Sequence, residues 1–142
     1  MKINKILLTA FICVAFIMSA SSGAAAQDDF RMFWKNFKAA VVGGDKAAAA
    51  RMTRFSLEMP AYQKGVKSRA DFLRRYGRIF NGETDAARCF SLAAPEKRDE
   101  KTYEIYCPVK LAPDDWTNAP VKYYFVLTKN GWKFAGLDNI NE

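Results

Sequence analysis

The sequence predicts an α+β fold in which helices come first and antiparallel strands follow. Apolar residues recur with the helical period over 28–42 and again over 68–80, which indicates amphipathic helices. Apolar and polar side chains alternate over 102–109, and Asn130-Gly131 joins two stretches rich in β-forming residues, as in a strand and a β-hairpin. Helices followed by an antiparallel meander define this class.

Residues 1–26 have the organisation of a secretory signal peptide. Two lysines precede an apolar stretch at 6–18, and a run of small residues at 19–26 ends in three alanines. The apolar stretch is shorter than the roughly 20 residues that a membrane span needs. We therefore expect cleavage before Gln27, export to the periplasm, and a single mature domain over 27–142 without a transmembrane segment.

The first helix of the mature chain is expected at 28–42, because five apolar residues share one face at helical spacing: Phe30, Phe33, Trp34, Phe37 and Val41. Gly43-Gly44 can end this helix, since glycine tolerates positive φ. Asp45 is suited to cap a second, alanine-rich helix at 46–52. A short extended piece at 55–59 follows.

Ser68 is suited to cap a third helix, which Asn81-Gly82 would end. Its apolar stripe consists of Phe72, Leu73, Tyr76, Ile79 and Phe80. Most of the remaining surface is occupied by Arg69, Arg74, Arg75 and Arg78. These arginines indicate either a solvated helix face or an anion-binding patch.

The segment after the third helix is harder to assign. Residues 83–92 fit a short helix or the lead into a strand, and we favour a helical turn that holds Cys89 near the sheet. Residues 94–101 are typical of a charged loop. The alternation over 102–109 places Cys107 on the apolar face, and Pro108, which cannot donate to a ladder, puts this strand at an edge or ends it there.

Cys89 and Cys107 are the two cysteines of the mature chain. An exported pair of this kind is expected to form one disulfide. Their spacing differs from the C-x-x-C of redox proteins, which favours a structural bridge over a redox site. Closing this loop would restrict the unfolded chain by about 3 kcal/mol.

The Asn130-Gly131 turn predicts a C-terminal hairpin with two distinct faces. The face expected to seat the helices collects Tyr123, Phe125, Leu127, Trp132 and Phe134. The opposite face collects Tyr124, Val126, Ala135 and Leu137. This second face is too apolar to be left wholly in water, so the chain's own segments cover it or it serves as a partner surface.

The composition limits the chemistry. The 142 residues include no His, which excludes a Ser-His or Cys-His catalytic pair, a His-ligated metal and a His pH switch. The 22 Lys and Arg against 15 Asp and Glu favour contact with lipid headgroups, wall polymer or acidic proteins, or simply provide solubility. We expect no cofactor, no metal and no nucleic-acid partner, since a basic stripe is not evident and Asp114-Asp115 alone are too few for a calcium loop.

Several landmarks together resemble a known superfamily. They are the Gly43-Gly44-Asp45 break between paired helices, Arg54-Phe55-Ser56-Leu57, the segment 68–76, and Gly131-Trp132-Lys133-Phe134. The chain is similar in these respects to small exported bacterial proteins of the NTF2-like, or cystatin-like, superfamily. The resemblance implies helices packed in the concave face of a curved antiparallel sheet, a cone with a cavity at its open end, and homodimerisation through the sheet. Members include ligand binders, adaptors, immunity-type proteins and a few enzymes, so the fold does not choose among them.

We therefore predict a non-catalytic periplasmic binding domain and assign no catalytic residue. Its partner would be a protein or cell-envelope component, as for an immunity, inhibitor or accessory protein, or a small apolar or acidic ligand held in the cone. The alternative is a small isomerase or hydratase that uses a buried Asp/Tyr pair, for which Asp71 and Tyr76 are the nearest acid and phenol.

Two sets of residues are candidates for binding. A cavity could be walled by Phe55, Tyr76, Tyr103, Phe125 and Trp132, with Arg54 or Arg75 at its mouth, although the same aromatic rings could simply fill the core. A partner could instead bind the outer sheet face or the loop that carries Trp116; the partner-surface candidates are Tyr124, Val126, Ala135, Leu137 and Trp116.

Overall fold

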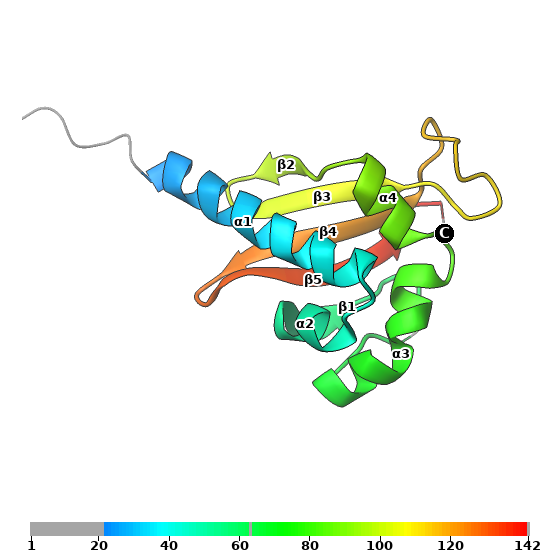
Figure 1. Cartoon of the computed structure of the whole chain (residues 1–142), viewed down its shortest axis with the longest axis horizontal. Helices are drawn as coiled ribbons and strands as arrows, with labels where there is room; N and C mark the ends of the chain where they lie inside the picture. The colour runs from blue at the N-terminus through cyan, green and yellow to red at the C-terminus, as the bar shows by residue number, and fades with distance from the viewer. Residues whose placement is uncertain (1–21, 63, 142) are drawn as a thin grey trace, which may run out of the picture.

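The computed structural model describes residues 22–62 and 64–141 of the chain (Figure 1). Most of the predicted signal peptide lies outside the described residues, and its cleavage stays a prediction. The elements in chain order are α1 (Ser22–Val42), α2 (Lys46–Arg51), β1 (Thr53–Glu58), α3 (Arg69–Asn81), α4 (Ala86–Leu92), β2 (Glu96–Asp99), β3 (Thr102–Cys107), β4 (Val121–Thr128) and β5 (Gly131–Asn139).

The strands form one five-stranded sheet in the order β1-β5-β4-β3-β2. Strands β2 to β5 pair antiparallel, as predicted, while β1 runs parallel to β5 at the edge. In Figure 1 α1 and α4 lie in front of this curved sheet, and α2 and α3 lie below β5, next to β1. The predicted α+β architecture, with helices against a curved sheet, is confirmed.

Helices α2 and α3 begin where their capping residues predict. The Asp45 carboxylate accepts a hydrogen bond from the Ala48 amide at 2.9 Å, and the Ser68 hydroxyl accepts one from the Asp71 amide at 3.2 Å. Gly44, with φ of 69°, takes the left-handed conformation between α1 and α2. Helix α1 begins upstream of the position predicted from its apolar stripe.

Residues 94–101 contain a strand, so the predicted loop is wrong there. Strand β2 pairs with β3 through Glu96↔Glu104 and Lys97↔Tyr103. All four residues of β2 are exposed. Because it buries neither face, β2 lacks the alternation by which a strand is recognised in sequence. Strand β3 ends at Cys107, directly before Pro108, as predicted.

The C-terminal hairpin differs from its predicted register. The loop is Lys129-Asn130, and Gly131, with φ of 86°, already pairs with Thr128. The glycine is therefore the first residue of β5 instead of the second residue of the turn. A turn at Asn130-Gly131 would pair Leu127 with Phe134, whereas Leu127 pairs with Trp132. Between the turn and Phe134 the partners therefore differ by two residues from those predicted, which leaves the faces unchanged there because strand side chains alternate.

A bulge in β5 changes the faces further along the hairpin. Phe125 pairs with Phe134, but the next pair is Tyr124 with Gly136. The extra residue, Ala135, reverses the alternation, so Leu137 pairs with Tyr123 on the face toward the helices and is 2% exposed. The prediction that Leu137 lies on the outer face is wrong for this reason.

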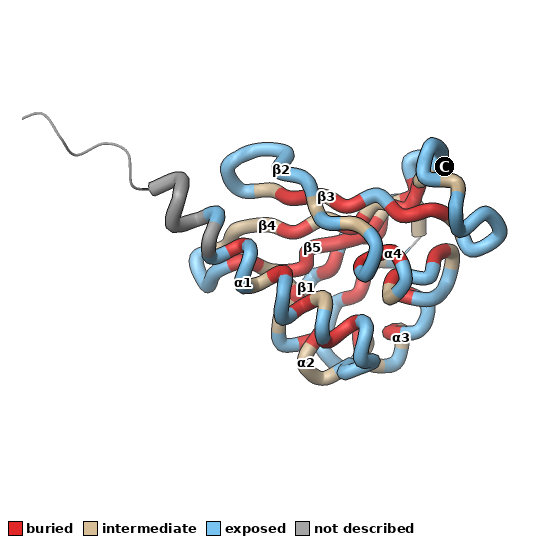
Figure 2. Tube along the Cα trace, turned by 45° about the horizontal axis from the view of Figure 1, so that its top comes forward, coloured by how far each residue is buried: buried red, intermediate tan, exposed pale blue. Residues whose placement is uncertain are grey.

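The core lies between the helices and the sheet, where aromatic rings pack against one another. Figure 2 shows the buried residues along the strands and the inner sides of the helices. The α1 ring of Phe30 lies 4.9 Å from Trp132 between centroids, and that of Phe37 lies 5.3 Å from Phe134. Trp132 and Phe134 therefore face the helices, as the predicted hairpin requires.

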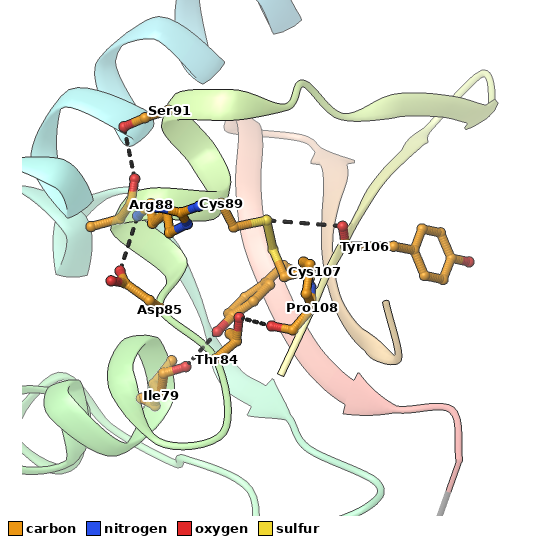
Figure 3. The surroundings of a disulfide bond; sticks show 11 residues. Ile79, Thr84, Asp85, Arg88, Cys89, Ser91, Tyr106, Cys107 and Pro108 are labelled. Carbon is orange, nitrogen blue, oxygen red and sulfur yellow. Dashed lines mark hydrogen bonds between the residues drawn. A yellow bond between two sulfur atoms is a disulfide. The ribbon is translucent and has the colours of Figure 1, made fainter. Parts of the chain in front are cut away.

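Cys89 and Cys107 form the predicted disulfide, which joins α4 to the end of β3 (Figure 3). Their Cα atoms are 5.7 Å apart, and both side chains are buried. The helical turn expected to hold Cys89 near the sheet is α4. Within 22–62 and 64–141, no helix combines the length and apolar character that crossing a bilayer requires.

Candidate functional site

Three of the predicted cavity residues contact α1 at the end of the core nearest the hairpin turns. Tyr103 stacks on Phe30 with ring centroids 3.5 Å apart, and Trp132 lies 5.4 Å from Tyr103. Phe125 is fully buried, and its ring packs edge-to-face with that of Phe33 at 5.8 Å between centroids. These rings touch ring to ring, so in this structure they fill the space that a ligand would need.

The other two predicted cavity aromatics belong to a separate group around α3. The rings of Phe55 and Tyr76 each meet Phe72 edge-on, at 6.0 and 5.9 Å between centroids. Tyr76 also packs against Phe80 at 4.9 Å. The five aromatic residues are therefore divided between two ends of the core.

The two arginines predicted at a cavity mouth hold other parts of the chain together. Arg54 forms an ion pair with Glu58 along β1, at 2.7 Å. Arg75 donates to the carbonyl oxygens of Lys64 and Gly65 at 3.0 and 3.2 Å. Arg75 therefore fastens the loop before α3 to the helix.

The acid and phenol of the enzyme alternative are not paired with each other. Asp71 lies 3.0 Å from Arg74 and 3.5 Å from Arg75. The Tyr76 hydroxyl is buried and has no hydrogen-bond partner within the described part of the chain. Burial raises the pKa of Tyr76, and the nearby Asp45 carboxylate raises it further. The acid whose charge acts on the Tyr76 phenol is thus Asp45, the cap of α2, and not Asp71.

Tyr124 takes part in a polar network on the outer face of the sheet. Its hydroxyl donates to Glu58 at 3.0 Å, and Arg54 pairs with the same carboxylate. Burial, followed by the bond to Glu58, raises the pKa of Tyr124. At Gly136 an added Cβ would overlap the Tyr124 hydroxyl and the Glu58 carbonyl oxygen, so the absence of a side chain at Gly136 leaves the Tyr124 ring room to reach β1.

Charged groups continue this network across the same face. Glu104 on β3 accepts from the Tyr106 hydroxyl at 2.8 Å and lies 3.5 Å from Lys122 on β4. Ala135, a predicted partner-surface residue, is fully buried, whereas Val126 is half-buried. The outer face is thus more polar than the sequence predicted.

The loop that carries Trp116 stands beside the disulfide. Trp116 is 39% and Leu111 98% exposed, and an Arg88–Asp114 ion pair of 2.5 Å ties the loop to α4. A shallow depression here has room for about one water molecule. It is lined by Thr84, Asp85, Arg88, Cys89, Pro108, Val109, Lys110, Pro113 and Trp116.

Positive charge is concentrated in the part of the chain that forms α1, α2 and α3. Residues 22–82, from the start of α1 to just past the end of α3, contain twelve Lys and Arg against five Asp and Glu, whereas residues 83–142 contain eight against ten. Helix α1 contacts α2, which contacts α3. Helix α1 exposes Arg31 at the start of its described face. We define the basic helical surface as six of the other exposed cations of these helices: Lys35, Lys46, Arg51, Arg69, Arg74 and Arg78.

Sequence reasoning identified only the α3 part of this surface. The arginines of α3 were visible because they flank one apolar stripe, but Lys35, Lys46 and Arg51 are scattered along the chain. Counting charges separately in each half of the sequence would have found the asymmetry. Three or more acidic or Cys side chains do not gather into a metal-binding group anywhere in the described ranges.

Comparison with known proteins finds similarity in fold. No family model and no curated protein matches the chain. A domain of unknown function with a cystatin-like fold from Nostoc punctiforme is 12% identical, with a TM-score of 0.43, over 87% of this chain and 80% of that one. An NTF2-like protein with a cystatin-like fold from Novosphingobium aromaticivorans is 12% identical, with a TM-score of 0.44, over 82% and 81%.

Proposed function

We propose that this protein is a non-catalytic binding domain of the periplasm, which acts through its outer surface on a protein or another component of the cell envelope. The observation that carries the proposal is the packing of the interior. The rings of Phe30, Tyr103 and Trp132 contact one another. A ligand inside the cone would have to displace them, whereas a partner at the surface would not.

The disulfide and the charge distribution support this assignment. A buried Cys89–Cys107 bridge suits an oxidising compartment such as the periplasm. The basic helical surface offers charge to an anionic partner without any rearrangement of the core. An accessory, inhibitor or immunity protein would use the fold in this manner, as a rigid support for a surface.

Native mass spectrometry of the protein recovered from the periplasm, after expression of the full chain, tests the proposal. We expect the mass of a chain that begins at Gln27, reduced by the two hydrogens lost in forming the disulfide, with no small molecule retained. An apolar or acidic molecule that stays bound would contradict the proposal. So would isomerase or hydratase turnover that is abolished in the Asp71→Asn variant.

A further inference from the structure

Most of the six cations of the basic helical surface have no carboxylate partner among the described residues, so they can contact an anionic partner outside the molecule. Arg74 pairs with Asp71, and the Lys46 ammonium lies 5.8 Å from the centre of the Tyr76 ring. Within the described ranges no carboxylate lies at ion-pair distance from any of the six except Arg74. Asp71 is shared with Arg75, and the Asp45 carboxylate is engaged in capping α2. The nearby acids therefore neutralise only part of the charge.

We propose that the basic helical surface docks onto the anionic headgroups of a phospholipid bilayer. The inference rests on the proposed function, because it names the cell-envelope component that the surface binds. Each Lys or Arg held near an anionic membrane surface contributes about fivefold in binding. Six cations, offset by Asp29, Asp45 and Asp71 on or beside the same helices, leave a net positive surface that favours reversible attachment to anionic headgroups.

The arrangement of the charges fits a membrane surface better than a defined ligand. The cations are distributed over three helices, and the depression described above lies elsewhere, beside the disulfide. A discrete anion would require converging donors, whereas a headgroup layer offers charge at every point of contact. The surface suits the spread of charge that a bilayer presents.

Exposed apolar side chains on α1 accompany the cations. Val42, directly before the turn into α2, is 46% exposed, and Met32 is 60% exposed. Lys35 and Val42 are seven residues apart and therefore share one side of the helix. Apolar groups that enter the boundary between headgroups and acyl chains, next to cations that remain at the phosphates, add to membrane binding.

Vesicle co-sedimentation of the processed periplasmic protein tests the inference. One set of vesicles contains phosphatidylcholine alone, and the other also contains phosphatidylglycerol. We expect binding to the anionic vesicles only, and its loss as salt is raised. The variant Arg51→Gln/Arg78→Gln, which removes two unpaired exposed cations, should bind about 25-fold more weakly, since each lost cation costs about fivefold.

The matched control is Lys101→Gln/Lys129→Gln, which changes the net charge equally at exposed turns of the sheet. We expect this variant to bind within about threefold of the original protein, because screening weakens charges beyond the contact area. Equal weakening of both variants would show that net charge alone governs binding and would overturn the inference. Binding to phosphatidylcholine alone, or tighter binding to soluble polyglutamate than to the anionic vesicles, would overturn it as well.

Failure of this inference is distinguishable from failure of the proposed function. If the mass spectrum shows no ligand and the protein does not bind vesicles, a lipid partner is excluded and a protein partner remains. A small molecule that stays bound in the mass spectrum would contradict the proposed function, whether or not the protein binds vesicles.

Discussion

The hydroxyl of Tyr123 forms a buried hydrogen bond between β4 and α3, and its removal tests how much this contact stabilises the fold. It donates to the carbonyl oxygen of Ile79 at 2.9 Å, and the side chain is fully buried. Ile79 lies in the last turn of α3, where carbonyl groups lack partners within the helix. Tyr123→Phe removes the donor while keeping the ring. Because the buried carbonyl is left unsatisfied, we expect a loss of about 2 kcal/mol in the free energy of unfolding.

This loss can be converted into a change in melting temperature. Unfolding entropy of about 2.1 cal/mol/K per residue gives about 0.24 kcal/mol/K for a domain of this size, so the midpoint should fall by about 8 °C. Circular dichroism melts and urea titrations would measure it. Tyr106→Phe is the matched control, because its hydroxyl bonds to Glu104 at the surface and its loss should cost less than about 0.5 kcal/mol. Equal effects of the two substitutions would refute the reasoning.

The remaining stability predictions concern the disulfide, two glycines and alkaline pH. Cys89→Ser/Cys107→Ser should lower the free energy of unfolding by about 3 kcal/mol, and adding reductant to the unchanged protein should reproduce this loss in a urea titration. Gly136→Ala should destabilise by about 1–3 kcal/mol because its Cβ would overlap neighbouring atoms. Gly77→Ala, where a Cβ meets open space on α3, should stabilise by about 0.5–1 kcal/mol. Burial raises the pKa of Tyr123 well above 10.0, so its phenol ionises more readily in the unfolded chain. Stability should be retained below pH 10 and fall as pH rises beyond it, which denaturation midpoints across that range would reveal.

Elements with a strong apolar period or a clear cap could be predicted from the sequence. Phe30, Trp34 and Phe37 place α1, and Ser68 places the start of α3, because burial and capping are local consequences of residue type. The disulfide was predictable for a similar reason, since Cys107 points to the apolar side of an alternating strand.

Features that depend on pairing between distant segments could not be predicted in this way. Strand β2 has no buried face, and the bulge at Ala135 appears only when β5 is laid against β4. The candidate cavity residues illustrate the same limit. The sequence pattern around Tyr103 or Phe125 is the same whether the buried ring lines a ligand cavity or packs against another ring. Only the contact of these rings with Phe30 of α1 shows that they pack in the core.

Because of the helix dipole, substitutions at the two ends of α3 should affect folding stability differently, even though both remove a cation from the basic helical surface. Arg69 is the first residue of α3, where the partial positive charge of the helix end disfavours a cation. Arg78 lies in the last turn, where a cation is favoured. Arg69→Glu should therefore stabilise the protein by about 1 kcal/mol, and Arg78→Glu should destabilise it by a similar amount.

Binding to anionic vesicles should respond in the same direction to both reversals. Each changes the surface by two charges and should weaken binding by about 25-fold, despite their opposite effects on the melting temperature. If the two substitutions shift the melting temperature in opposite directions but both weaken vesicle binding, Arg69 occupies a position where a cation serves binding and not folding. If Arg69→Glu lowered the melting temperature, the cation at the start of α3 would have a structural role. If this variant bound vesicles as tightly as the original protein does, Arg69 would not belong to a membrane-binding surface, and that surface would have to be sought elsewhere.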